Sequence, residues 1–158
     1  LKEYSSAYNA AIEAYKKQII DEIEIPFFVY SSRLLQSYQG GQGVLMENDG
    51  ESIRFKAPGK EHDILYTMSS GQLSAVLLSF SLALNKIYAS DGIKTVMIDD
   101  PIQCMDDINM ISFVELLRRE FDDCQIILST HEEDFSNFIR YKFKKYGLVT
   151  QAITLKDA

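Results

Sequence analysis

Two short apolar runs with a helical pattern between them constrain the fold of this chain more than any other feature. Residues 95–98 (Thr-Val-Met-Ile) and 125–128 (Gln-Ile-Ile-Leu) have the length and the β-branched character of strands. The first run is almost wholly apolar, which is typical of a strand buried on both faces of a parallel sheet. Residues 109–121 carry apolar side chains at helical spacing and predict a helix between the strands. This order predicts an α/β fold with a mostly parallel sheet flanked by helices.

Further elements are predicted on both sides of this unit. Residues 72–88 have the apolar spacing of a helix, and residues 90–92 (Ser-Asp-Gly) predict the turn that follows it. Residues 44–55 read as a hairpin that turns at residues 48–50. Residues 132–140 predict a last helix, and residues 141–155, with a turn at Gly147, predict two terminal strands.

The N-terminal region has an amphipathic helical pattern over residues 1–23. Such a helix either packs on the domain or is the stub of a coiled coil, and the pattern alone leaves both open. Pro26 predicts a kink or break and a second helix over residues 27–38. We therefore divide the chain into an amphipathic helix, residues 1–25, and a lobe, residues 26–158.

Composition excludes several classes of protein. With 158 residues, 46% of them hydrophobic and 25% charged, the chain should fold as a single domain. A net charge of −7 argues against a dense basic face for wrapping nucleic acid. The longest nearly apolar stretch, residues 75–84, is well short of the roughly 20 residues that cross a bilayer. No secretory signal is visible, so we expect a cytoplasmic protein without membrane contact.

Acidic and histidine side chains follow the two predicted strands. Asp99 and Asp100 come directly after the first strand, and His131 follows the second. Ligands bind at the carboxyl ends of strands in open α/β sheets, where one carboxylate could hold hydrated Mg²⁺ while its neighbour addresses a water. The alternative is a solvated strand end beside a surface histidine.

A second candidate site lies at the start of the helix over residues 72–88. Residues 68–72 (Met-Ser-Ser-Gly-Gln) place hydroxyl groups and free backbone N–H groups at a helix N-terminus. These groups form either an anion site or a plain N-cap. The glycines of residues 40–43 predict only a helix stop. A phosphate-binding loop of the type GxxxxGK[ST] is not found, because Glu61 follows the Gly59-Lys60 pair.

The order of these motifs resembles the C-terminal lobe of an ABC-type ATPase head. Residues 68–72 resemble the signature motif, residues 95–100 resemble Walker B, residues 103–106 (Gln-Cys-Met-Asp) sit at the D-loop, and residues 130–131 match the H-loop. Within that superfamily the chain resembles chromosome-maintenance and DNA-repair heads of the SMC, SbcC and RecN types. The resemblance covers nearly all of residues 36–155.

The resemblance implies roles for the candidate residues. Asp99 would position Mg²⁺, Asp100 would polarise the attacking water, and His131 would contact the γ-phosphate of ATP. Asp106 would lie at the seam between two heads. The signature residues would reach ATP held by a second head; they are Ser69, Ser70, Gly71 and Gln72.

Three departures from the family pattern qualify these roles. Asp100 stands where a glutamate is usual, and Ser70 stands where a glycine is usual. Walker A and the Q-loop are not found in the sequence, so the chain by itself is not expected to hydrolyse ATP.

The resemblance also implies partners. They are an N-terminal lobe carrying Walker A, a second head in a homodimer, DNA through the full assembly, and a nuclease as a further candidate. Two alternatives remain: a degenerate lobe that serves protein assembly, and an ABC ATPase outside genome maintenance.

Overall fold

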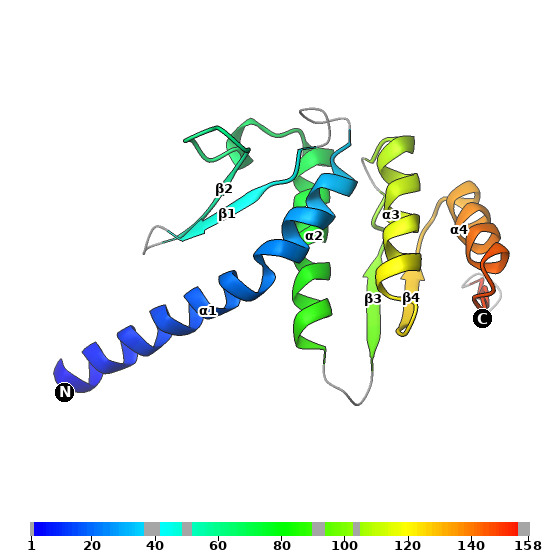
Figure 1. Cartoon of the computed structure of the whole chain (residues 1–158). Coiled ribbons are helices and arrows are strands. Elements are labelled where there is room, and N and C mark those ends of the chain that lie inside the picture. Colours follow the sequence, from blue (N-terminus) through cyan, green and yellow to red (C-terminus); the bar gives the residue numbers. More distant parts are fainter. Residues whose placement is uncertain (1, 37–41, 49–51, 90–93, 103–104, 155–158) are drawn as a thin grey trace.

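The computed structural model describes residues 2–36, 42–48, 52–89, 94–102 and 105–154. It confirms the α/β class, with a long N-terminal helix leading into a layered body (Figure 1). The elements in chain order are α1 (Lys2–Leu34), β1 (Leu45–Asn48), β2 (Ile53–Lys56), a 3₁₀ turn (Leu65–Thr67), α2 (Ser70–Tyr88), β3 (Thr95–Asp99), α3 (Asp107–Glu120), β4 (Gln125–Ser129) and α4 (Glu133–Lys145). Among these residues no helix has both the length and the apolar character needed to span a bilayer.

Within the described residues, the strands form two separate pairs. β3 and β4 are parallel, with Thr95 opposite Gln125 and Asp99 opposite Ser129, and α3 connects them. β1 and β2 form the predicted antiparallel hairpin. Parts of several predicted turns and motifs lie outside the described residues, namely residues 40–41, 49–50, 90–92 and 103–104.

The core lies where the second half of α1 meets α2 and α3. Phe27 of α1 is fully buried and packs edge-on against Phe55 and Phe80, with ring centroids 5.6 and 6.1 Å apart. Phe113 and Phe135 stack between α3 and α4 at 6.4 Å. Burial of these apolar surfaces is the main force that holds the helices together.

Of the kink or break predicted at Pro26, the break is wrong, because α1 continues through this residue to Leu34. Proline removes one backbone hydrogen bond from a helix interior. However, Ile23 and Phe27 on either side of it are both fully buried in the core. The burial of α1 residues on both sides of Pro26 offsets that loss.

The expectation that β3 is buried on both faces is also wrong. Val96 is 4% exposed, but Met97 is 75% exposed, and Ile127 beside it on β4 is 46% exposed. Because successive strand residues alternate between faces, the pair buries one face against the core and leaves the other open.

The predicted terminal strands are not formed. α4 runs to Lys145, past the predicted end at residue 140, and residues 146–154 contain no strand. Phe143 continues the buried face that Phe135 and Ile139 begin, four residues apart on the helix. The helix stops where Gly147 takes a left-handed conformation with φ of +81°, which is a common C-terminal signal.

Candidate functional site at the carboxyl edge of the parallel strands

The two aspartates and the histidine predicted from the sequence lie together at the carboxyl ends of β3 and β4. Asp99 ends β3 opposite Ser129, and the Ser129 hydroxyl donates a hydrogen bond to the Asp99 carboxylate. Asp99 lies on the same open face of the strand pair as Met97, because the two are two positions apart on one strand.

At Asp100 the backbone leaves the extended conformation of β3. Among the described residues it is the one non-glycine residue with positive φ, at +42°. Its backbone N–H donates to the Ser129 carbonyl at 3.0 Å. Its carboxylate faces the loop after β4: Oδ2 lies 2.8 Å from Nδ1 of His131, and Oδ1 accepts a long hydrogen bond of 3.5 Å from the Thr130 hydroxyl.

Glu132 is a neighbour of the site that sequence reasoning missed. Its Oε1 lies 3.3 Å from Nε2 of His131, so the imidazole has a carboxylate near each nitrogen. Only its position next to His131 in the sequence could have pointed to it. The Glu132 side chain is 57% exposed and that of His131 is 62% exposed, so solvent reaches this contact.

The signature-like residues form the N-terminal cap of α2. The Ser69 hydroxyl accepts from the backbone N–H of Gln72 at 3.3 Å, and the Gln72 side chain accepts from the Ser69 N–H at 2.9 Å. This reciprocal pair is a capping box. Ser69 and Ser70 are exposed, while Gly71 and Gln72 are half-buried. The plain cap is therefore formed, and it lies at the surface.

Asp106 is the N-cap of the next helix, without the reciprocal bond of a capping box. Its carboxylate accepts from the backbone N–H of Asn109 at 2.8 Å at the start of α3, and the residue is exposed. The N-terminal ends of α2 and α3 lie on the same side of the molecule as the carboxyl ends of β3 and β4 (Figure 1). All the predicted site residues thus lie toward one side.

The donor set at this edge suits a metal ion that is shared with a substrate. Asp99 supplies one exposed carboxylate, and no group of three or more metal-ligating side chains is found in the described part of the chain. Mg²⁺ usually keeps several waters and takes one or two carboxylates together with phosphate oxygens. Asp99 therefore fits a Mg²⁺ that also binds phosphates, and the described residues do not form a closed protein cage.

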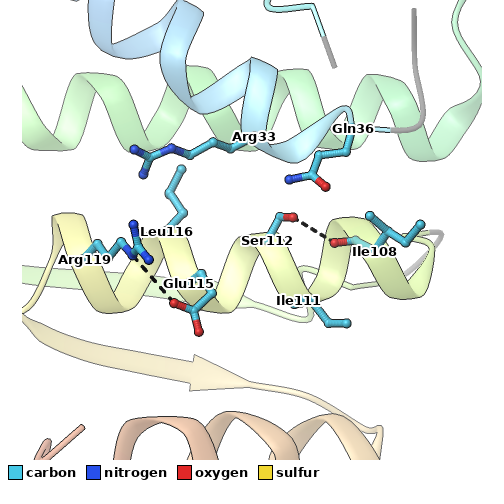
Figure 2. Close-up of a pocket in the computed structure, with 8 residues that line it drawn as sticks. All are labelled: Arg33, Gln36, Ile108, Ile111, Ser112, Glu115, Leu116 and Arg119. Atoms are coloured by element: carbon cyan, nitrogen blue, oxygen red, sulfur yellow. Dashed lines mark hydrogen bonds and ion pairs between the residues drawn. The ribbon is translucent and has the colours of Figure 1, made fainter. Parts of the chain in front are cut away.

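A surface groove of about 400 Å³ lies elsewhere, between the end of α1 and α3 (Figure 2). Arg33 of α1 and Gln36, two residues beyond its end, line one side, and α3 lines the other with residues that include Ile108 and Ile111. None of the predicted site residues lines this groove, so it is not the candidate catalytic centre.

Comparison with known proteins identifies the fold of the chain. No protein-family model matches the sequence, and no curated protein matches it either. Solved structures do match. An SMC ATPase, studied for ATP-driven dimerization and DNA-stimulated activation, superposes with a TM-score of 0.61 at 18% identity. The chain has the fold of an SMC ATPase head domain.

Two further SMC heads support this conclusion. The SMC head bound to the C-terminal winged-helix domain of ScpA matches with a TM-score of 0.57 at 21% identity, and the SMC head domain from Thermotoga maritima with 0.52 at 22%. The matches cover 78%, 75% and 79% of this chain. They cover 76% of the first structure but only 36% and 44% of the other two, so the chain corresponds to part of those longer head chains.

Proposed function

We propose that this chain is the C-terminal lobe of an SMC-like ATPase head that binds and hydrolyses ATP where two heads meet and drives a DNA-associated clamp. The observation that carries the proposal is the meeting of Asp99, Asp100 and His131 at the carboxyl edge of two parallel strands in an SMC head fold. For such a clamp we propose a cytoplasmic location, associated with the nucleoid if the source is a bacterium.

The uncovered face of the β3–β4 pair supports the proposal that an N-terminal lobe completes the head. Met97 and Ile127 leave an apolar face uncovered by the described residues, and a parallel sheet is normally covered on both faces. A lobe carrying Walker A would cover this face and hold the triphosphate, so the complete site requires it. That lobe belongs either to the same parent chain or to a separate one.

Phosphoryl transfer needs mainly positioning and charge stabilisation, and the residues of this edge can provide both. Asp99 would hold Mg²⁺, which supplies positive charge to the phosphate oxygens. Asp100 and His131 would act at the γ-phosphate. We assign them to the hydrolysis of ATP bound by the N-terminal lobe.

A second head would complete the site from the other side. The exposed N-terminus of α2 offers Ser69, Ser70, Gly71 and Gln72 to ATP held by that head, since helix N-termini attract anions. Asp106, exposed at the start of α3, would lie at the seam. ATP would thereby link two copies of the head, and hydrolysis would depend on their closure.

The first part of α1 supports the assignment of residues 1–25 as a coiled-coil stub and residues 26–158 as the head lobe. Three exposed tyrosines, Tyr4, Tyr8 and Tyr15, are four and seven positions apart, which places them on one seam of a heptad pattern. This part of the helix extends away from the body (Figure 1). A coiled coil here would connect the head to a DNA-embracing assembly, with which a nuclease is a candidate partner.

The test is reconstitution with the N-terminal lobe of the parent protein. We expect the chain alone to show no saturable ATP binding at micromolar nucleotide and the joined lobes to hydrolyse ATP. Asp99→Ala should abolish turnover, whereas Asp122→Ala, which removes an exposed aspartate before β4, should leave it unchanged. Full activity of Asp99→Ala would remove this residue from the metal site. Pairing of heads without nucleotide would instead favour a role in protein assembly.

A further inference from the structure

Basic side chains gather where α3 and α4 end, although the chain as a whole is acidic. We propose that this surface is a docking site for a partner protein, which it binds through a short acidic segment of that partner. The site goes beyond the proposed function, because it lies outside the candidate ATPase edge. We call it the basic patch, and it consists of five side chains from the last turns of the two helices: Arg118, Arg119, Lys142, Lys144 and Lys145.

The charge of the chain is unevenly distributed along the sequence. The net charge is −7, yet residues 135–154 include four basic side chains and no aspartate or glutamate. Just after the arginines of α3, Glu120 and Asp123 each form an ion pair with a basic residue outside the patch, at 3.1 and 2.7 Å, and Asp122 is exposed. The patch is therefore a local excess of positive charge on an acidic molecule.

Contacts between the two helices bring three of the basic side chains to one carboxylate. The Glu115 carboxylate lies 2.6 Å from Lys142 on α4. On its own helix it lies 2.7 Å from Arg118 and 3.7 Å from Arg119. Because three cations share a single carboxylate, this group keeps an excess of positive charge. Glu115 also shows which ligand chemistry suits the patch, since carboxylate oxygens accept charge-assisted hydrogen bonds from arginine and lysine.

The remaining cations are available to a second carboxylate. Lys144 and Lys145 are exposed, and neither forms an ion pair within the described part of the chain. The side chain of Arg119 is 62% exposed. Cations at a helix C-terminus also complement the helix dipole. That interaction is with the backbone, so the exposed charged groups can still bind an anion.

Two tyrosines add apolar contact area beside the cations. Arg118 lies 3.8 Å from the centroid of the Tyr146 ring, and Lys145 lies 5.9 Å from that of Tyr141. Both tyrosines remain more than half exposed. Tyrosine and arginine are enriched among the residues that contribute most to protein–protein binding. A polypeptide could therefore bury these rings while its carboxylates pair with the cations.

The number of available cations favours an acidic protein segment over DNA. Proteins that bind duplex DNA tightly through its backbone make roughly 6–10 phosphate contacts. Here Arg118 and Lys142 are already engaged by Glu115, so three cations of the patch are left for a ligand. The acidic remainder of the chain also repels a long polyanion, whereas a short segment contacts the patch alone.

The position of the patch leaves the candidate ATPase edge accessible. The C-terminal ends of α3 and α4 lie on the opposite side of the molecule from the N-terminal ends of α2 and α3 (Figure 1). A partner bound at the patch can therefore be present while the other side of the lobe meets a second head.

The test measures binding of a fluorescently labelled octaglutamate peptide to the chain by anisotropy, at low salt and without nucleotide. Lys144→Glu combined with Lys145→Glu should weaken binding on the order of tenfold or more, because each reversal replaces an attraction by a repulsion. Lys144→Gln combined with Lys145→Gln keeps good helix formers at both positions and should weaken binding to a smaller extent. Lys16→Glu combined with Lys17→Glu, at two exposed lysines of α1, is the matched control. It changes the net charge as much as the first variant and should leave the affinity within about twofold.

Three results would overturn the proposal. The first is a wild-type chain that does not bind the peptide, and the second is an equal loss of binding in the two charge-reversal variants. The third is a DNA duplex of about 15 base pairs that binds as tightly as the peptide and competes with it, which would assign the patch to nucleic acid. No nucleotide is used, so the outcome is independent of whether the reconstituted head hydrolyses ATP.

Discussion

The hydroxyl of Tyr88, at the end of α2, donates a hydrogen bond to the carboxylate of Glu22 on α1, 66 positions away in the sequence. Glu22 lies one turn before Pro26, on the stretch of α1 that continues through the proline. The contact joins the two helices whose packing keeps α1 unbroken.

Replacing Tyr88 by phenylalanine should raise the pKa of Glu22. The Tyr88 hydroxyl, followed by the Gln18 amide, holds the pKa of Glu22 below its ordinary value of 4.5. A lowered pKa in the folded state means that the contact stabilises the protein above pH 4.5 and loses this effect as the pH falls through the lowered pKa. In Tyr88→Phe, the pKa of the Glu22 carboxyl measured by NMR titration should rise toward 4.5. Tyr66→Phe, at an exposed tyrosine, is the control and should leave the titration unchanged.

Replacing Gly43 by alanine should destabilise the fold by roughly 1–3 kcal/mol, the usual cost of overpacking. A Cβ at this position would lie 2.5 Å from the backbone oxygen of Phe28 on α1. Because the nearest atom belongs to the backbone, trimming the Phe28 ring should not restore stability. Gly59→Ala meets no neighbour within 4 Å and has only its left-handed φ to oppose it, so it should cost about 1 kcal/mol. Equal urea midpoints for Gly43→Ala and the wild type would contradict the close packing.

Glu115 should contribute to stability in a pH-dependent way, because it links α3 to α4. Its carboxylate lies 2.6 Å from Lys142 and 2.7 Å from Arg118, and Lys142 above all holds the pKa of Glu115 below 4.5. We expect Glu115→Gln to lower the free energy of unfolding by about 1 kcal/mol at neutral pH. The difference should disappear as the pH falls through the lowered pKa, where the wild-type carboxylate also becomes neutral. Urea unfolding at neutral pH and at a pH below the lowered pKa of Glu115 measures this difference. Glu13→Gln, in an exposed ion pair, is the control. A difference that persists in acid would point to lost packing rather than lost charge.

Removing the Ser69 hydroxyl should separate the capping role from the proposed ATP contact. Ser69→Ala should cost about 1 kcal/mol of stability through loss of the N-cap. In the reconstituted head it should also lower turnover at temperatures where the fold is intact. Ser69→Asp keeps a capping oxygen but adds a negative charge, so it should retain stability and still lose turnover. Normal turnover in Ser69→Asp would leave the residue with a capping role alone.

Local patterns predicted most of the elements, because they depend on neighbouring residues. The spacing of apolar residues predicted α2, α3 and both parallel strands to within a few residues. The rule that parallel strands end at one edge correctly predicted that Asp99, Asp100 and His131 would lie together. The contact of Glu132 with His131 and the left-handed turn at Asp100 were not predicted, since neither has a local sequence signal.

The sequence by itself therefore determined the α/β order and the edge at which the charged residues collect, since both follow from periodicity and strand direction. Only the tertiary structure decided that α1 passes through Pro26, that α4 extends to include Phe143, and that β3 is covered on one face. Each of these outcomes depends on which distant surface is available for burial. Ile23 and Phe27 are buried in the core, and Phe143 completes a buried face of α4. Met97, in contrast, is not covered by any of the described residues.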